Sequence, residues 1–483
     1  MKNVKIKNNE LLLFLIFLTP FFTHYLYSYL FNSLFLEDIG ELSFTSLMSL
    51  LIYAPLIYFF CRKNIKLYIF ILCFHFLIST LELFYILLYE SSVNISTFCI
   101  IFETFDNIFV KVFYSYSKYS NEAKKFESVT QKKDSDMEEV SFNKKTDGNE
   151  IYILIIGESA SRTHMSLYGY FRKTTPELDS ISKELFIFNN VISSGTTTIP
   201  TVNKIVTFNN PENNEDSFKH KNIIQFFKKA GFKTYWISNH TPYGKYDSYI
   251  ITMTAKVSDQ VFWVNMNKDF FTGKSFDDKV FYPLNKIFSD KYEKKFIIIH
   301  LLGMHASYSK RYPGDYAVFN ENRKEHTDIQ NEKINTYDNA VLYNDYIVSE
   351  IIKMVKKQDS SSFVLYLSDH GEDVFDEADF AGHSDGHLTR YMLEIPFVLW
   401  VSEKYKNFNK DKVEQFKDLL SRSYMTDDVM HTIFDLCNID CKSYNPEKSI
   451  ISKNFISKKR IINTIDYDRN LTIKNKLAKA VIK

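Results

Sequence analysis

Long apolar runs dominate the first ninety residues of the chain. Three of them, at 11–31, 43–60 and 67–89, contain almost no charged side chains. Each is close to the roughly 20 residues that a helix needs to cross the hydrocarbon core of a bilayer. The first run is longer than the core of a signal peptide, and no small-residue cleavage site follows it. We therefore predict three transmembrane helices and a membrane anchor at 1–90.

The charges between these runs predict their orientation. Lys2, Lys5 and Lys7 precede the first run, and the basic cluster that includes Arg62 and Lys66 lies between the second and third. Cytoplasmic loops carry the excess of lysine and arginine, so the N-terminus and this loop are expected inside. Three crossings then leave the rest of the chain outside.

Polar character increases after the third run. The stretch 95–114 is apolar but includes Glu103, Asp106 and Lys111, so we expect an amphipathic helix lying on the outer membrane face; a fourth span is the alternative. Residues 115–150 are charged and poor in large apolar side chains, as linkers are. Together, 91–150 is predicted to be an external helix and linker.

A different pattern begins at residue 151. Short apolar runs of the kind found in buried parallel strands recur along the chain. They alternate with amphipathic stretches at 218–230, which stops at Gly231, and at 332–357. This alternation predicts a doubly wound α/β domain over 151–483. The expected strands are "IYILIIGE" (151–158), "KTYWIS" (233–238), "FIIIHLL" (296–302), "FVLYLSDH" (363–370) and "PFVLWVS" (396–402).

Two of these runs end in residues that bind metals. Glu158 ends the first, and Asp369-His370 end the fourth. Ligands gather beyond the carboxyl ends of parallel strands, so the three side chains are expected to meet there. Two carboxylates and an imidazole suit zinc. A solvated loop turn is the alternative for Asp369-His370.

Three consecutive threonines, Thr196 to Thr198, follow Gly195 and precede a helical stretch. Threonine is a common helix N-cap. It can also be a nucleophile where a metal ion and a helix N-terminus stabilise its alkoxide. The local sequence alone favours the cap.

Other histidines and the cysteines add less. His305 follows a strand and a glycine, and His383 and His387 lie in a polar loop after Asp369-His370. Each of the three could bind a second metal or a phosphate oxygen; a solvated side chain is the alternative for His387. His300 is expected in a core strand. Cys437 and Cys441 either form a small disulfide or remain thiols. A net charge of +1 gives no indication of nucleic acid binding.

These motifs, in this order, resemble the bacterial phosphoethanolamine transferases of the alkaline phosphatase/sulfatase superfamily. The resemblance covers about 151–468 and is closer to the branch that modifies the core sugars of lipopolysaccharide than to the lipid A branch associated with polymyxin resistance. It is carried by "GESASRTHMSLYGYFRKTTPELD" (157–179), "SSGTTTIPTV" (193–202), "GFKTYWISN" (231–239), "HLLGMHASYSKRYP" (300–313), "INTYDNAVLYNDYIV" (334–348), "LSDHGEDVFD" (367–376) and "FAGHSDGHLTRYMLEIPFVLW" (380–400).

The resemblance implies roles for particular residues. It makes Thr198 the nucleophile and a zinc ligand. It assigns His305 and His383 to catalysis and, with Asn239, to substrate binding. One tightly bound zinc ion is expected, with a second ion left open. The implied zinc ligands are Glu158, Thr198, Asp369 and His370.

It also implies an activity and a location. The enzyme would take phosphoethanolamine from phosphatidylethanolamine, hold it on Thr198, and pass it to lipopolysaccharide or another surface glycan. It would be a monomer with a multi-pass anchor in the bacterial inner membrane and a periplasmic catalytic domain. The alternatives are a phosphoglycerol transferase of the same superfamily and a membrane-tethered binding module with a dead site. A sulfatase is disfavoured because threonine cannot become formylglycine.

The chain departs from its relatives at three places. Relatives usually have five membrane helices, whereas three are predicted here. Ile108 stands where relatives often carry a glutamate near the donor headgroup. Ser194 and Lys204 occupy the positions of a disulfide that flanks the nucleophile in the lipid A branch, so the nucleophile loop is expected to lack that cross-link.

Overall fold

The computed structural model describes residues 138–143, 148–210, 221–241, 249–265 and 274–472. The chain divides into two units, 1–128 and 129–483, and all described residues belong to the second. The predicted membrane segments and the stretch 95–114 lie outside the described residues. Within the described part, no helix has the length and apolar character needed to cross a bilayer.

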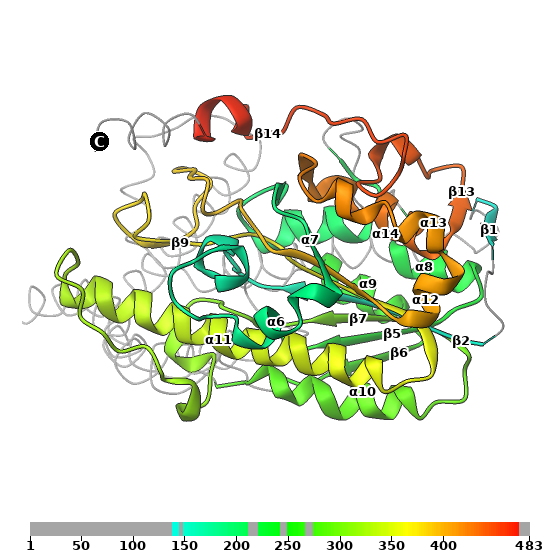
Figure 1. Ribbon diagram of the computed structural model, residues 1–483, viewed down its shortest axis with the longest axis horizontal. Helices are drawn as coiled ribbons and strands as arrows, with labels where there is room; N and C mark the ends of the chain where they lie inside the picture. Colours follow the sequence, from blue (N-terminus) through cyan, green and yellow to red (C-terminus); the bar gives the residue numbers. More distant parts are fainter. Residues whose placement is uncertain (1–137, 144–147, 211–220, 242–248, 266–273, 473–483) are drawn as a thin grey trace, which may run out of the picture. The chain divides into compact units, whose positions relative to one another are not determined.

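A sheet forms the centre of the described unit, and its strands β2, β5, β6 and β7 can be followed in Figure 1. It has seven strands in the order β3-β11-β8-β2-β7-β5-β6. Strands β8, β2, β7, β5 and β6 run parallel. The strands of this sheet are β2 (Asn149–Gly157), β3 (Leu185–Ile187), β5 (Lys233–Ser238), β6 (Gln260–Trp263), β7 (Lys294–His300), β8 (Ser360–Ser368) and β11 (Phe397–Val401).

Strand β11 corrects one prediction. The run 396–402 was expected to be a parallel strand, but β11 pairs antiparallel with both β8 and β3. A parallel connection needs a crossover, usually a helix. Between β8 and β11 the chain forms only β9 (Asp373–Val374) and β10 (Ala381–Gly382), and it therefore returns in the opposite direction.

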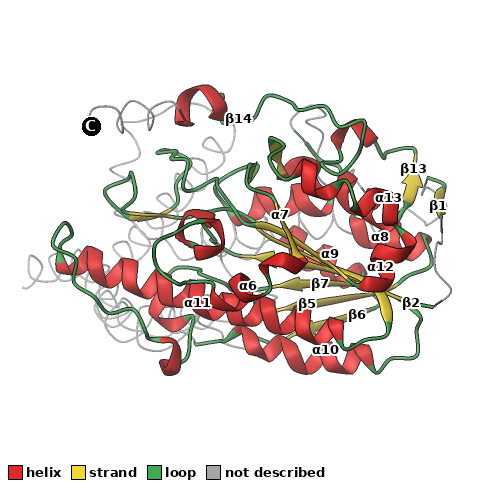
Figure 2. Cartoon of the chain, viewed as in Figure 1, coloured by secondary structure: helices red, strands yellow, loops and turns green. Residues whose placement is uncertain are grey.

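Helices cover both faces of the sheet (Figure 2). Side chains of β2 alternate between two cores: Leu154 packs with α7, α8 and α14, and Ile153 packs with α10 and α11. Both residues are fully buried. The helices are α6 (Pro176–Ser180), α7 (Thr198–Val206), α8 (Ile223–Lys229), α9 (Tyr249–Val257), α10 (Phe281–Phe288), α11 (Asp328–Lys356), α12 (Glu403–Phe408), α13 (Lys410–Val413) and α14 (Val429–Cys437).

Helix ends follow their local sequences. Asn222 and Gln225 form a capping box at the start of α8, and Gly231 follows the helix with φ +82°, as expected for a C′ glycine. Thr327 caps α11, which therefore begins four residues before the predicted position.

Short pairs of strands border the main sheet. They are β1 (Val140–Phe142) with β13 (Ile439–Cys441), β4 (Val191–Ile192) with β12 (Tyr424–Met425), β9 with β10, and β14 (Ile461–Ile462) with β15 (Ile465–Asp466). Cys437 and Cys441 are both buried free thiols, so the structure has the second of the two predicted alternatives.

Candidate active site

The site begins where the two central strands end. Strands β2 and β8 pair in register through Gly157 and Ser368. The next residue on each chain, Glu158 and Asp369, therefore emerges at the same edge, and His370 follows. All three side chains are fully buried. The structure thus brings together the groups that the strand ends predicted.

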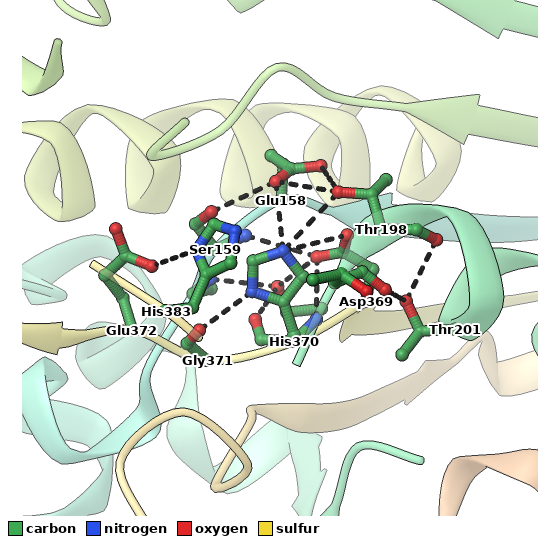
Figure 3. A network of polar contacts seen from close by, with 12 residues as sticks. Glu158, Ser159, Thr198, Thr201, Asp369, His370, Gly371, Glu372 and His383 are labelled. Carbon is green, nitrogen blue, oxygen red and sulfur yellow. Dashed lines mark hydrogen bonds and ion pairs between the residues drawn. The ribbon is translucent and has the colours of Figure 1, made fainter. Parts of the chain in front are cut away.

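Thr198 joins them as the first residue of α7 (Figure 3). Its Oγ1 lies 3.1 Å from Glu158 Oε2 and 3.4 Å from His370 Nε2. The N-cap is Thr197, whose side chain makes no capping hydrogen bond. Thr197 therefore occupies the N-cap position without capping the helix through its side chain. The hydroxyl of Thr198 points at the Glu158 carboxylate.

The donor set fits a tetrahedral metal ion. Ligands about 2 Å from a tetrahedral zinc ion lie roughly 3.3 Å from one another. Here His370 Nε2 lies 3.3 Å from Glu158 Oε1 and 3.5 Å from Asp369 Oδ2. Asp369 Oδ2 is buried and has no hydrogen-bond partner among the described residues. A buried carboxylate oxygen without a donor points to a cation as its partner.

The electrostatics agree with this interpretation. Burial and the neighbouring Glu158 charge raise the pKa of Asp369 to about 7. Burial would raise the pKa of Glu158 as well, but the hydrogen bond and charge of His370 hold it well below its usual value. Burial opposes charge on His370, yet the Asp369 and Glu158 carboxylates raise its pKa to about 10. Two buried acids share one imidazole, so the site favours an added positive charge.

The backbone at the site is tightly constrained. Ser159 adopts a left-handed conformation (φ +57°), and its N–H donates to Asp369 Oδ1. Strained residues of this kind concentrate at functional sites. Gly303 passes so close to Glu158 that an added Cβ would lie 2.6 Å from the Glu158 carbonyl oxygen. These contacts hold the ends of β2 and β8 and the turn after β7 together.

His383 lies beside the cluster, with its ring centroid 4.1 Å from that of His370. Its Nδ1 is 2.7 Å from Glu372 Oε2 (Figure 3). Glu372 Oε1 accepts a hydrogen bond from the Tyr308 hydroxyl at 2.5 Å. Glu372 therefore fixes the orientation of the imidazole. The sequence placed Glu372 only two residues after His370, which was the available signal for it.

His305 follows the turn after β7. Its backbone carbonyl accepts from Arg311 Nε, and burial lowers the pKa of its imidazole to about 4. The Glu158 charge partly opposes this lowering of the pKa. At neutral pH the imidazole is uncharged.

Asn239 has a different environment from the one expected. Its side chain is fully buried, donates to Asp277 Oδ1 and accepts from the Ser275 hydroxyl. Asp277 in turn accepts from the N–H groups of Leu302 and Gly303. In this structure Asn239 supports the turn that precedes His305; its contact with substrate stays a prediction. The sequence carried no signal for Asp277.

Two further groups bring metal-ligand atoms close together. In the first, Glu158 is joined by His240 and His300, whose rings stack 4.0 Å apart at 9°. One ion cannot lie in the planes of two parallel stacked rings, and His240 Nε2 already bonds to the Leu301 carbonyl at 2.8 Å. We therefore interpret this pair as packing. His300 ends β7 and is buried, so its expected place in the core is confirmed.

The second group is His370, Glu372 and His383. His370 Nδ1 lies 2.8 Å from the Gly371 carbonyl oxygen and is used there. Its Nε2 faces Glu158 and Thr198. Since His370 has one nitrogen left for a ligand, a second ion would have only Glu372 and His383.

Comparison with known proteins defines the class. The Sulfatase family matches residues 150–439, so the chain belongs to this family. The predicted resemblance to phosphoethanolamine transferases is confirmed by several relatives. Phosphoethanolamine transferase EptC of Escherichia coli O18:K1:H7 is 35% identical over 66% of this chain and 58% of the relative. Phosphoethanolamine transferase CptA of Salmonella typhimurium is 33% identical over 67% of this chain and 58% of the relative.

The chain thus spans about 58% of the length of these curated relatives. A solved structure is also similar: the zinc complex of the C-terminal periplasmic domain of EptC from Escherichia coli. The TM-score is 0.65 at 33% identity, covering 69% of this chain and 96% of that domain.

Proposed function

We propose that this chain is a zinc-dependent phosphoethanolamine transferase. It takes the group from phosphatidylethanolamine and passes it to lipopolysaccharide, on a core sugar or on lipid A. The observation that carries this proposal is the position of the Thr198 hydroxyl, 3.1 Å from Glu158 and 3.4 Å from His370 at the strand edge of a sulfatase-family domain. Relatives named for this transfer support the substrate class.

Zinc held by Glu158, Thr198, Asp369 and His370 would favour the alkoxide of Thr198 and offset charge on phosphoryl oxygens. Thr198 Oγ1 then forms a bond to the donor phosphorus, and the bond from phosphorus to the diacylglycerol oxygen breaks. That oxygen leaves with a proton as diacylglycerol.

In the second half, an acceptor hydroxyl attacks the phosphorus and Thr198 leaves. The N-terminus of α7 directs its dipole toward the developing negative charge. His383, oriented by Glu372, and the uncharged His305 bind phosphoryl oxygens or carry the protons of the two half-reactions.

The proposal includes a location. Residues 1–90 would anchor the chain in the bacterial inner membrane through three helices, and 91–150 would form an external helix and linker. Residues 151–483 would then be a monomeric periplasmic domain that meets its lipid donor at the membrane. A reporter that is active only in the periplasm, fused after residue 150, should be active; a silent reporter would contradict this orientation.

Mass spectrometry of lipopolysaccharide tests the activity. Cells with the wild-type chain should carry about one added phosphoethanolamine unit, and cells with Thr198→Ala should lack it. Thr197→Ala is the matched control, because the neighbouring Thr197 hydroxyl makes no capping bond, and it should keep the modification.

The site of the added mass, in isolated core or lipid A, identifies the acceptor. A glycerol phosphate mass would identify the phosphoglycerol transferase instead. Wild-type cells with no change in any surface glycan, together with purified protein lacking bound metal, would reject the enzyme and favour a tethered binding module.

A further inference from the structure

The nucleophile loop has a cross-link that the sequence did not suggest. The resemblance places Ser194 and Lys204 at the two positions that a disulfide joins in the lipid A branch, and these two residues cannot form that disulfide. In the structure, Lys204 Nζ donates to the Ser194 carbonyl oxygen at 3.0 Å. This contact closes residues 194–204 into a loop, the nucleophile ring, with Thr198 inside it. We propose that Lys204 is a positioning residue that holds Thr198 in reach of its partners; this rests on the proposed function of Thr198 as nucleophile.

Contacts inside the nucleophile ring restrict its movement. The Thr201 hydroxyl is 2.7 Å from the Thr197 carbonyl oxygen and 3.0 Å from that of Thr198 (Figure 3). A Cβ at Gly195 would lie 3.2 Å from Thr201 Cγ2, so the two sides of the loop are already in contact. Movement at the Lys204 end of the ring is therefore transmitted to Thr198.

The base of the ring rests on a second element. Strand β4 pairs with β12, and the N–H of Ser194 donates to Thr426 Oγ1. The next two residues, Asp427 and Asp428, are buried and both pair with Lys458, at 2.8 Å and 2.6 Å. The segment after β12 is thereby fixed on one side by ion pairs and supports the ring on the other.

The charge of Lys204 matters to this arrangement. Burial lowers the pKa of Lys204, and Asp427 is the largest of the charges that oppose this effect. Lys204 also lies in the last turn of α7, where a cation interacts favourably with the helix dipole. A hydrogen bond from an ammonium to a carbonyl is stronger than a neutral one, so an uncharged side chain of the same length would not replace it.

Catalysis depends on this positioning. Oγ1 of Thr198 must stay near Glu158 and His370, and displacement of about 1 Å can reduce a rate by roughly 100-fold. The proposal therefore predicts a loss in the chemical step when the ring opens. Binding of the donor should change less, because Lys204 is proposed to act on the position of Thr198.

The experiment uses the full chain in detergent with three variants. Lys204→Met removes the ammonium at nearly constant length, and Lys204→Arg keeps a cation. Lys406→Met is the matched control, because Lys406 lies on α12 and pairs with Glu403 of the same helix. The readouts are amide hydrogen exchange over residues 194–201, the thermal midpoint, and kcat and KM for phosphatidylethanolamine.

Lys204→Met should speed exchange in 194–201 at least tenfold and lower kcat about tenfold, with KM within about twofold of wild type. Lys204→Arg should recover most of kcat, and Lys406→Met should match wild type. Unchanged exchange in Lys204→Met would overturn the proposal. So would faster exchange across the whole domain, or an equal loss of kcat in Lys406→Met.

Hydrogen exchange needs no substrate, so it separates the two proposals. One combination of results would reject the proposed function but keep the proposed cross-link. In it, wild-type protein carries no phosphoethanolamine adduct on Thr198, and Lys204→Met still speeds amide exchange in residues 194–201.

Discussion

Buried acids serve two purposes in this domain. Asp369 is fully buried with an oxygen that lacks a donor among the described residues, as a metal ligand would be. Asp345 on α11 is also buried, but its two oxygens accept from the backbone N–H groups of Glu177 and Leu178 at the start of α6. Asp345 therefore satisfies a helix terminus from a distant part of the chain.

Asp345 should make stability depend on pH. Burial is the main cause that raises its pKa to about 7 from an ordinary value of 3.8. Between these values the folded chain keeps a proton that the unfolded chain has lost, so the free energy of unfolding falls as pH rises from about 4 to about 7. The full effect is on the order of 4 kcal/mol.

Asp345→Asn removes this titration. Thermal unfolding across that range should show a smaller decrease in stability for Asp345→Asn than for wild type. Asp359→Asn, at an exposed position, should follow the wild-type curve. Parallel curves for wild type and Asp345→Asn would contradict the prediction.

At the scale of elements, the site depends on loops that close against strand ends. Gly371 follows His370 directly, and its N–H donates to the Met392 carbonyl at 2.8 Å. A Cβ at this position would lie 2.2 Å from the Tyr391 carbonyl oxygen and 3.1 Å from the Met392 carbonyl carbon. Two stretches of backbone are therefore in contact, and only glycine allows it.

Gly371→Ala should separate those two stretches. Forced overpacking of this kind costs about 1–3 kcal/mol, and the shift would move His370 away from Glu158. We expect a lower thermal midpoint and a loss of bound metal by elemental analysis. Gly386→Ala is the control, because its nearest contact would be Ser384 Oγ at 3.7 Å. Full metal content in Gly371→Ala would show that the backbone adjusts.

The hydrophobic pattern predicted the strands in which nearly every residue is buried. The runs at 151–158, 233–238, 296–302 and 363–370 became β2, β5, β7 and β8, since buried parallel strands need apolar side chains on both faces. The three-residue β3 and the β6 edge strand carry too short a pattern to stand out. The direction of β11 depends on what lies between it and β8, which an apolar run does not encode.

The candidate site, too, has residues whose positions the sequence predicts and contacts that it does not predict. The positions of Glu158, Asp369 and His370 were predictable because strand ends determine them. The contacts of Asp277, Glu372 and Lys204 were not predictable from the sequence. Each contact either joins segments that are distant in sequence or depends on the conformation of a loop. Asn239 illustrates this: its motif suggested substrate, whereas its amide bonds to a neighbouring loop.

At the scale of the whole molecule, the site joins segments from most of the described chain. The ligand candidates come from positions 158, 198, 369 and 370, and Lys204 and the segment after β12 support one of them. A metal ion there would link the two central strands to α7. Its binding energy would then add to the stability of the whole domain.

Metal removal should therefore lower the thermal midpoint. An ion present at about 1,000 times its Kd contributes roughly 4 kcal/mol. A chelator should lower the midpoint of wild type by several degrees, and zinc should restore it. Asp369→Asn should respond little to either addition. A wild-type midpoint that ignores the chelator would argue against a tightly bound ion.

The pairing of β1 with β13 has a consequence for the order of folding. Ser141 and Asp440 lie opposite each other although 299 residues separate them. At about 5–20 residues per second, β1 would leave the ribosome many seconds before its partner strand exists. During translation β1 cannot form this pairing until β13 has been synthesised. A nascent chain arrested before residue 439 would leave this edge unpaired, and an unpaired strand edge offers its backbone N–H and C=O groups to other chains.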